Sequence, residues 1–162
     1  MWNFSKFKNK VALIDNNEKI YYKDLTTYSK KIEKKLRKKS LTVMLADNSL
    51  GSIICYISLV KKRYPLLILD HKISKKFLKK ILQLYNPENI CLPIKNSFFR
   101  RNKDFEFNFE FKSLCFLKNI KKDTFQVQNN LSILATTSGS TGSAKLIKQS
   151  YNNIKYNTYS IL

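Results

Sequence analysis

Nine consecutive residues, 137–145, combine side chains whose types and spacing suit phosphate binding. The sequence of this segment is Thr137-Ser138-Gly139-Ser140-Thr141-Gly142-Ser143-Ala144-Lys145, and it contains two of the chain's 3 glycines. Glycines let backbone N–H groups approach phosphates closely, hydroxyls add donors that can reorient, and a lysine adds a positive charge. The segment therefore predicts a polyphosphate-binding loop, and the alternative is a Ser- and Gly-rich turn between two strands.

The glycine spacing separates this segment from two common nucleotide-binding loops. A Walker loop has four residues between its glycines and continues with Gly-Lys-Ser or Gly-Lys-Thr. Here two residues separate Gly139 from Gly142, and Lys145 lies three positions later. A dinucleotide-binding fingerprint needs a third glycine, which this segment lacks. Neither motif therefore describes the loop.

Cysteine and histidine usage argues against metal-dependent or histidine-dependent chemistry. The 3 cysteines, Cys55, Cys91 and Cys115, are far apart in the sequence and show no CxxC spacing. We therefore expect reduced thiols, with neither a disulfide framework nor a zinc site. His71 is the only histidine, which argues against a histidine-based triad. It is predicted to be a surface residue beside Asp70. No metal ligand is predicted, and no catalytic residue is assigned.

The net charge of +20 has two interpretations. A basic surface can bind nucleic acid or an anionic membrane. Alternatively, lysines can simply cover solvated faces. Of the 31 cationic residues, four are arginines, so 27 are lysines. Because surfaces that read nucleic-acid sequence favour the planar arginine fork, we expect no specific nucleic-acid site.

The sequence shows no membrane-targeting feature. The first ten residues lack the apolar core of a signal peptide. The longest apolar-leaning run, residues 50–60, is too short to span a bilayer. We therefore expect a cytoplasmic protein.

Hydrophobic periodicity predicts an α/β fold on a mostly parallel sheet, with helical crossovers. Two short strands are expected first, and strands and helices then alternate, as apolar runs and 3.6-residue periods alternate in the sequence. The expected strands are residues 11–14, 19–22, 41–46, 66–69, 89–92 and 131–136, and the expected helices are residues 24–39, 49–62 and 73–85. A chain of 162 residues fits one domain. The strand at 131–136 leads directly into the candidate loop.

Residues 105–111 follow a different pattern. Four phenylalanines alternate with Glu106, Asn108 and Glu110. This two-residue period predicts a strand with one aromatic face. Such a face could stack bases, but the interleaved acids would repel phosphate, so a core-facing strand is the preferred interpretation.

The candidate loop resembles the AMP-binding signature of the adenylate-forming superfamily, which includes acyl-CoA synthetases, nonribosomal peptide adenylation domains and luciferases. The usual signature is Thr-Ser-Gly-Thr/Ser-Thr-Gly-x-Pro-Lys-Gly. This sequence follows it from Thr137 to Gly142 and again at Lys145, but has Ala144 and Leu146 where Pro and Gly are usual. Residues 150–154 resemble the family's Ser-His-x-Asn-Leu, with Tyr151 in place of the histidine.

Weaker similarities lie upstream in the same order. Residues 20–25 resemble the family's Thr-Tyr-x-Glu-Leu helix entry, and residues 45–49 resemble its Leu-x-x-Asn-Ser turn. Residues 59–70 align with the family's stretch from Leu-Ala-x-x-Lys-Ala-Gly-Ala to Pro-Leu-Asp, with Arg63 replacing the Gly and Ile68 replacing the Pro. The resemblance covers most of residues 11–154, and residues 93–130 are unmatched.

The resemblance implies an AMP-forming acyl-activating ligase. Such enzymes join a carboxylic acid to ATP, release pyrophosphate, and usually pass the acyl group to a thiol of coenzyme A or of the phosphopantetheine of an acyl carrier protein. ATP and Mg²⁺ would be the cofactors, and ATP and a carboxylic acid the ligands. The residues implied to hold the nucleotide phosphates are Thr137, Ser138, Gly139, Ser140, Thr141, Gly142 and Lys145.

The family's later motifs have no counterpart in this sequence, which ends in the expected helix after the loop. Residues 1–162 are therefore expected to be a partial AMP-binding domain, an incomplete N-terminal part of the large domain, with the C-terminal domain absent and no activity on its own. The alternatives are a non-catalytic module that binds nucleotides or anions, and a basic nucleic-acid-binding protein.

Overall fold

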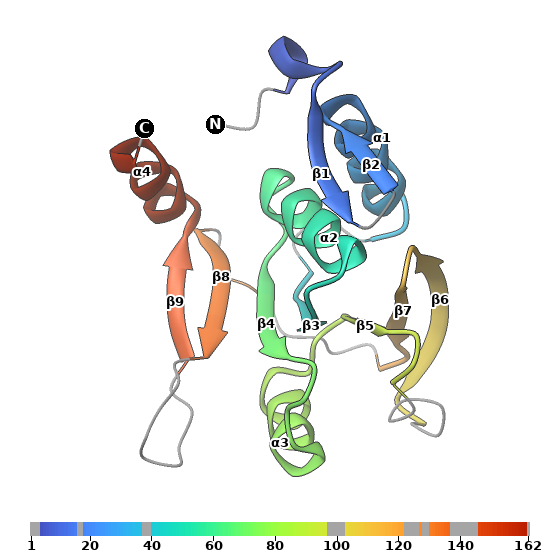
Figure 1. The fold of residues 1–162 in the computed structure, drawn as a ribbon. Coiled ribbons are helices and arrows are strands. Elements are labelled where there is room, and N and C mark those ends of the chain that lie inside the picture. Colours follow the sequence, from blue (N-terminus) through green and yellow to red (C-terminus); the bar gives the residue numbers. More distant parts are fainter. Residues whose placement is uncertain are drawn as a thin grey trace.

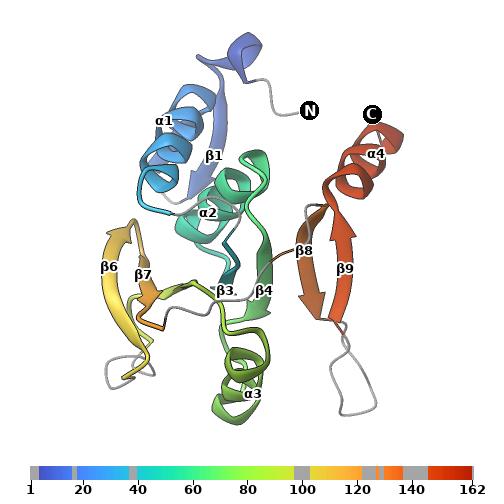
Figure 2. The same ribbon diagram turned by 180° about the vertical axis from the view of Figure 1, so that it is seen from behind.

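The computed structural model describes residues 4–15, 18–36, 40–96, 103–121, 127, 130–136 and 146–161. Its main body is a seven-stranded sheet in the order β6-β7-β5-β3-β4-β8-β9 (Figures 1 and 2). The strands are β3 (Thr42–Ala46), β4 (Leu66–Asp70), β5 (Asn89–Pro93), β6 (Phe105–Phe111), β7 (Leu114–Asn119), β8 (Leu131–Thr136) and β9 (Leu146–Ser150). The four central strands, β5-β3-β4-β8, pair in parallel, and the outer strands pair antiparallel. The predicted α/β fold on a mostly parallel sheet is confirmed.

Two crossover helices cover opposite faces of the sheet. Helix α2 (Leu50–Lys61) joins β3 to β4, and α3 (Lys75–Tyr85) joins β4 to β5. In β3, Met44 packs in the cluster that contains α2, whereas Val43 packs in the cluster that contains α3. Both faces of β3 are therefore buried, which explains why its sequence is apolar rather than alternating.

Helix α2 is the more deeply buried of the two. Its N-cap is Ser49, whose hydroxyl accepts from the backbone N–H of Ser52 at 3.3 Å. On one side of α2, Ser58 hydrogen-bonds the buried Ser29 hydroxyl of α1 (Tyr22–Glu33), with 3.1 Å between the two oxygens. On the other, Gly51 faces the β6–β7 turn so closely that a Cβ there would lie 2.9 Å from Ser113 Oγ. Glycine at this position thus lets the turn approach the helix.

The N-terminal segment forms a separate layer over α2 (Figure 1). It comprises a short 3₁₀ helix, η1 (Ser5–Phe7), the antiparallel pair β1 (Val11–Asp15) and β2 (Glu18–Tyr21), and α1 (Tyr22–Glu33). A capping interaction begins α1, because the Asp24 carboxylate accepts from the backbone N–H of Tyr21 at 2.8 Å. None of the helices among the described residues is long and apolar enough to cross a bilayer.

Two departures from the family signature, Arg63 and Tyr151, contact each other. Arg63 follows α2 with a φ of 58°, a left-handed conformation in which glycine is the usual residue. Its guanidinium lies 4.4 Å from the centre of the Tyr151 ring. Tyr151 is the first residue of α4 (Tyr151–Ile161), a helix with no buried residue. The cation–π contact therefore links the end of α2 to the start of α4.

Strand β6 differs from the predicted single aromatic face. A bulge between Phe107 and Phe109 shifts the register against β7. Phe105 packs in the α3-side cluster, whereas Phe109 and Phe111 pack in the α2-side cluster. Phe107 is 62% exposed. The prediction of one core-facing row of phenylalanines is therefore wrong, because an extra residue in a strand reverses which side chains face each side.

This bulge predicts unequal effects for two substitutions that the sequence pattern treats as equivalent. The Phe109 ring stacks on the fully buried Phe116 ring at 4.3 Å between centroids. We expect Phe109→Ala to lower the free energy of unfolding by about 2 kcal/mol, below the cost for a fully buried phenylalanine. Phe107→Ala should change it by no more than about 0.5 kcal/mol. Urea denaturation of both variants is the measurement, and equal losses would contradict the bulge.

Candidate functional site

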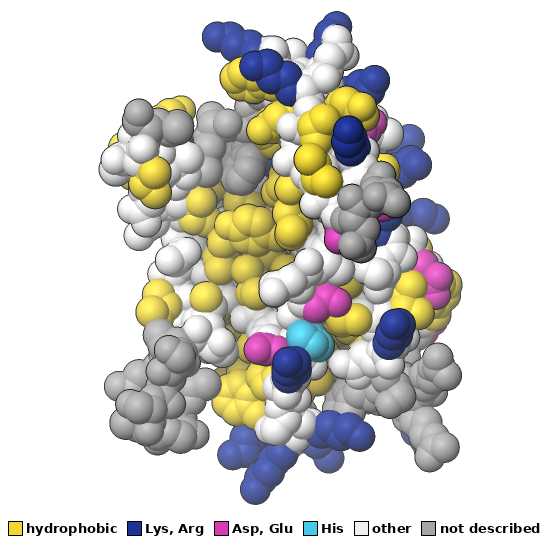
Figure 3. All heavy atoms as spheres, in the orientation of Figure 1, with side chains coloured by type: hydrophobic (Ala, Val, Ile, Leu, Met, Phe, Trp, Pro, Cys, Tyr) yellow, Lys and Arg dark blue, Asp and Glu magenta, His cyan; other side chains and the backbone are white. Residues whose placement is uncertain are grey.

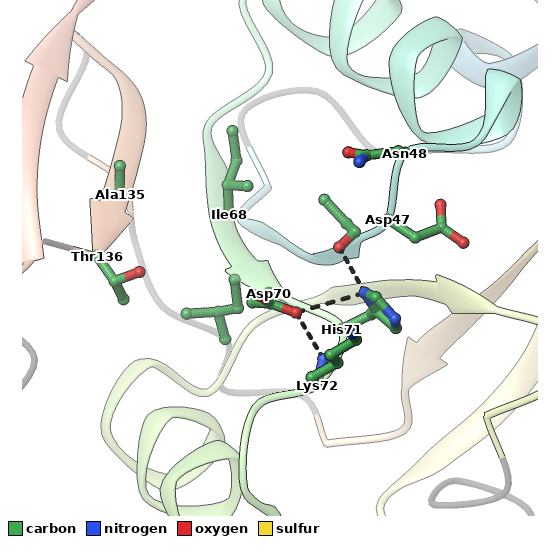
Figure 4. Close-up of a pocket in the computed structure, with 10 residues that line it drawn as sticks. Asp47, Asn48, Ile68, Asp70, His71, Lys72, Ala135 and Thr136 are labelled. Atoms are coloured by element: carbon green, nitrogen blue, oxygen red, sulfur yellow. Dashed lines mark hydrogen bonds and ion pairs between the residues drawn. The ribbon is translucent and has the colours of Figure 1, made fainter. Parts of the chain in front are cut away.

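A pocket of about 410 Å³ opens at the carboxyl ends of three parallel strands, β3, β4 and β8 (Figure 4). Its lining residues are Ala46, Asp47, Asn48, Ile68, Leu69, Asp70, His71, Lys72, Ala135 and Thr136. This volume is within the range of small-molecule sites. In Figure 3, acidic side chains and the histidine lie beside a hydrophobic area of the surface.

Strand register explains why these residues meet. Ala46 of β3 pairs with Asp70 of β4, and Ile68 of β4 pairs with Ala135 of β8. The chain leaves β3 into a helix on one face and leaves β4 into a helix on the other. Ligands of open α/β sheets bind outside the carboxyl ends of the strands at such a switch point. The pocket therefore occupies the position where this topology favours a ligand.

Asp47 organises the turn that follows β3. Its carboxylate accepts from the Ser49 hydroxyl at 2.5 Å, the Ser49 backbone N–H at 3.1 Å and the Ser52 hydroxyl at 2.7 Å. Partial burial alone would raise the pKa of Asp47, but the hydrogen bonds from Ser49 and Ser52, with His71 nearby, hold it below its ordinary value. The carboxylate is thus ionised and held by its own turn.

Asp70 and His71 form the corresponding turn after β4. The Asp70 carboxylate accepts from the backbone N–H of Lys72 at 2.7 Å. The His71 Nδ1 atom lies 3.4 Å from Asp70 and 3.3 Å from the carbonyl oxygen of Ala46, as Figure 4 shows. His71 is partly exposed, and in this position it lines the pocket and connects the two turns.

The predicted phosphate-binding loop is attached at the same edge of the sheet. Thr136, the last residue of β8, lines the pocket and pairs with Leu146, the first residue of β9. The loop residues themselves lie outside the described part of the chain: Thr137, Ser138, Gly139, Ser140, Thr141, Gly142 and Lys145. Of the two residues that flank this segment, Thr136 lines the pocket and Leu146 is its pairing partner on β9.

Sequence reasoning did not assign Asp47, Asp70 and Lys72 to the site. A signal for them was present, since Asp47 directly follows the predicted strand 41–46, and Asp70 and Lys72 lie within three residues after the predicted strand 66–69. Residues that follow parallel strands share one edge of the sheet. The rule can be applied only when the order of the strands in the sheet is known. The sequence does not show that β8 lies beside β4, so it could not group these residues with Thr136.

Metal and thiol chemistry find little support among the described residues. In that part of the chain, no group of three or more His, Cys, Asp or Glu side chains could hold a metal ion. Burial, with the Cys55 thiol beside it, raises the pKa of Cys91 well above its usual range. Burial also raises the pKa of Cys115. Both thiols are therefore poor nucleophiles.

The hydrogen bonds to Asp47 predict a pH-dependent effect of Asp47→Asn. A carboxyl group whose pKa is depressed by folding stabilises the protein above its unfolded pKa, and loses that effect as the pH falls through the folded value. The substitution should therefore lower Tm near neutral pH, and the difference from the unsubstituted protein should shrink as the pH falls from about 5 to about 2, through and below the ordinary pKa of 3.8. Thermal denaturation across this range is the measurement. A difference that stays constant with pH would show that the carboxylate charge has no part in the turn.

Comparison with known proteins identifies the fold. No protein-family model matches the sequence, and no curated protein matches it. Among solved structures, o-succinylbenzoate coenzyme A synthetase (MenE) from Bacillus subtilis, in complex with AMP, superposes with a TM-score of 0.68 at 15% identity, covering 98% of this chain and 43% of that one. MatB from Rhodopseudomonas palustris superposes with a TM-score of 0.63 at 13% identity, covering 95% of this chain and 34% of that one. The Klebsiella oxytoca NpsA N-terminal subdomain, in complex with 3-hydroxyanthranilyl-AMSN, superposes with a TM-score of 0.59 at 14% identity. The match covers 91% of this chain and 38% of that one.

These similarities extend over nearly the whole chain, which itself spans less than half the length of each of these structures. They are all adenylate-forming enzymes. The resemblance that the loop signature predicted is therefore confirmed at the level of the fold: this chain has the same fold as part of the large domain of these enzymes.

Proposed function

We propose that this chain is the N-terminal, phosphate-binding part of an AMP-forming acyl-activating ligase. In this proposal, residues 1–162 form part of an adenylation domain, and the pocket together with residues 137–145 holds ATP. The reaction joins a carboxylic acid to the α-phosphate of ATP, which forms an acyl-adenylate and releases pyrophosphate. A thiol of coenzyme A or of an acyl carrier protein is the proposed acceptor.

The observation that carries the proposal is the attachment of the loop at the pocket. Thr136 lines the pocket and is followed by the one segment of the sequence suited to phosphate binding. Solved structures of the same fold hold AMP and the acyl-adenylate OSB-AMP. The fold, the pocket and the loop signature thus all point to an adenine nucleotide.

The proposed roles follow from the chemistry of the loop residues. Gly139 and Gly142 would allow backbone N–H groups to reach phosphate oxygens, and the hydroxyls of Thr137, Ser138, Ser140 and Thr141 would donate further hydrogen bonds. Lys145 would add a positive charge. Donors fixed before the reaction stabilise the charge that develops on the departing pyrophosphate.

Magnesium fits this site as part of the substrate. Mg²⁺ keeps several waters and is usually bound through substrate phosphates with one or two carboxylates, rather than by a cage of protein ligands. The pocket contains two carboxylates, Asp47 and Asp70. Both already accept hydrogen bonds within their own turns. Magnesium would therefore arrive with ATP, where it would neutralise phosphate charge.

Substitutions in the loop test the proposal directly. We expect Thr141→Ala to weaken binding of ATP by about 10- to 100-fold, because it deletes one hydrogen bond to a charged group. Gly142→Val should abolish binding, because a branched side chain blocks the approach of backbone to phosphate. Lys145→Ala should also weaken binding of ATP, and this loss should become smaller as the salt concentration rises, because salt screens the interaction between the lysine and the phosphates. Isothermal titration calorimetry with ATP and Mg²⁺ is the measurement.

Ser143→Ala is the matched control, since it removes a hydroxyl from the same loop at a position outside the predicted phosphate contacts. Its affinity for ATP should stay within about twofold of the unsubstituted chain. Unchanged affinity in Gly142→Val would mean that the loop is only a turn. ATP–pyrophosphate exchange with a panel of carboxylic acids should stay at the background of the Lys145→Ala variant, because residues 1–162 are expected to be inactive alone. Exchange above that background would show ligase activity in this part of the protein and contradict that expectation.

A further inference from the structure

Two helices carry lysine clusters with identical spacing. One cluster lies at the end of α1 and the other at the start of α3. The α1 cluster is Lys30, Lys31, Lys34 and Lys35, and the α3 lysine face is Lys75, Lys76, Lys79 and Lys80. All eight residues are exposed. Because the spacing and the charge are the same, any difference between the clusters comes from their position on the helix.

The α1 cluster is compatible with the stability of its own helix. Lys30 and Lys31 lie in the last turn of α1, where positive charges interact favourably with the helix dipole. Lys31 also lies 5.9 Å from the centre of the Tyr28 ring. An acidic residue, Glu33, lies within the cluster and pairs with Lys62. Folding alone is a sufficient reason for lysines here.

The α3 lysine face opposes the stability of its helix. Lys75 and Lys76 occupy the first turn, where positive charges are unfavourable and no acidic residue is present. The pairs Lys75–Lys79 and Lys76–Lys80 place like charges one turn apart. Helix α3 contains no Asp or Glu, and none of the four lysines forms an ion pair with another described residue. The charge is therefore uncompensated within this part of the molecule.

We propose that the α3 lysine face is a docking surface for an acidic protein. Figure 3 shows basic side chains gathered at the lower end of the molecule, over α3. Leu84 is 70% exposed and lies one turn beyond Lys80 on the helix surface. An exposed leucine beside a row of cations matches an acidic helix that also carries apolar side chains. This surface does not depend on nucleotide binding by the chain.

The geometry favours a protein over other polyanions. Helices that bind membranes insert their apolar face, but the apolar residues Leu78 and Ile81 of α3 are buried against the sheet. Surfaces that bind single-stranded nucleic acid combine cations with aromatic side chains on which bases stack. The one aromatic residue among residues 77–84, Phe77, packs against the α3-side cluster, and the exposed residues beyond Lys80 are Gln83 and Leu84, neither of which is aromatic. The α3 lysine face therefore fits the acidic surface of a folded partner.

The position of this surface also relates it to the pocket. Lys72 lines the pocket and precedes Lys75 by three residues. A protein held on α3 would consequently lie at the rim of the pocket. Such a partner could present a group to a ligand bound there.

The matched lysine clusters supply the experiment. The probe is a labelled helical peptide of about 20 residues, with glutamate pairs one turn apart and a leucine stripe, and its binding is followed by fluorescence anisotropy. Lys75→Glu/Lys76→Glu should lower its affinity about tenfold, and Lys30→Glu/Lys31→Glu, with the same change in charge, less than about twofold. Leu84→Ala should also lower the affinity for the peptide, although it leaves the charge of the protein unchanged.

Thermal denaturation gives an independent readout that the variants are folded. Carboxylates favour the first turn of a helix and disfavour its last turn, so Lys75→Glu/Lys76→Glu should raise Tm, whereas Lys30→Glu/Lys31→Glu should lower it. Equal losses of peptide affinity in the two double variants would overturn the proposal. The same holds if the α3 variant loses binding to a single-stranded RNA or to phosphatidylserine vesicles but keeps its affinity for the peptide.

Discussion

The parallel pairing of β3 with β4 is the interaction on which the rest of this structure depends. Both strands are apolar and covered on both faces, so neither can leave the sheet without exposing two hydrophobic clusters. Their register brings Ala46 beside Asp70 and so fixes where both strands end. The chain then leaves the two strands into helices on opposite faces. The pocket is a direct consequence of this divergence, because no helix covers the space between the two strand ends.

Local irregularities in the fold are compensated by contacts nearby. Arg63 adopts a left-handed conformation without being a glycine, and its guanidinium stacks on Tyr151. The bulge in β6 exposes Phe107 but turns Phe109 onto Phe116. In both cases a residue near the irregularity makes a ring contact: Arg63 with Tyr151, which is distant in the sequence, and Phe109 with Phe116 on the neighbouring strand. These contacts connect the edges of the sheet to its buried centre.

Charge and chemistry are separated in this molecule. The carboxylates of the pocket accept hydrogen bonds from their own turns, which orders the carboxyl edge of the sheet. The positive charge consists largely of lysine, and part of it lies on the exposed sides of α1 and α3. Such a distribution raises the local concentration of anions around the molecule. It is compatible with a site for an anionic nucleotide and, on α3, with an acidic partner.

The sequence by itself determined the fold class, the crossover helices and the phosphate-binding signature, because apolar periodicity and glycine spacing are local properties of the chain. Only the tertiary structure decided that Asp47, Asp70 and His71 share one pocket with the end of β8, since strand order depends on long-range pairing. The two faces of β6 were equally unpredictable, because one unpaired residue reverses an alternation that is otherwise regular. The lysines of the α1 and α3 clusters have the same spacing in the sequence. Their difference arises from the opposite helix ends at which they lie.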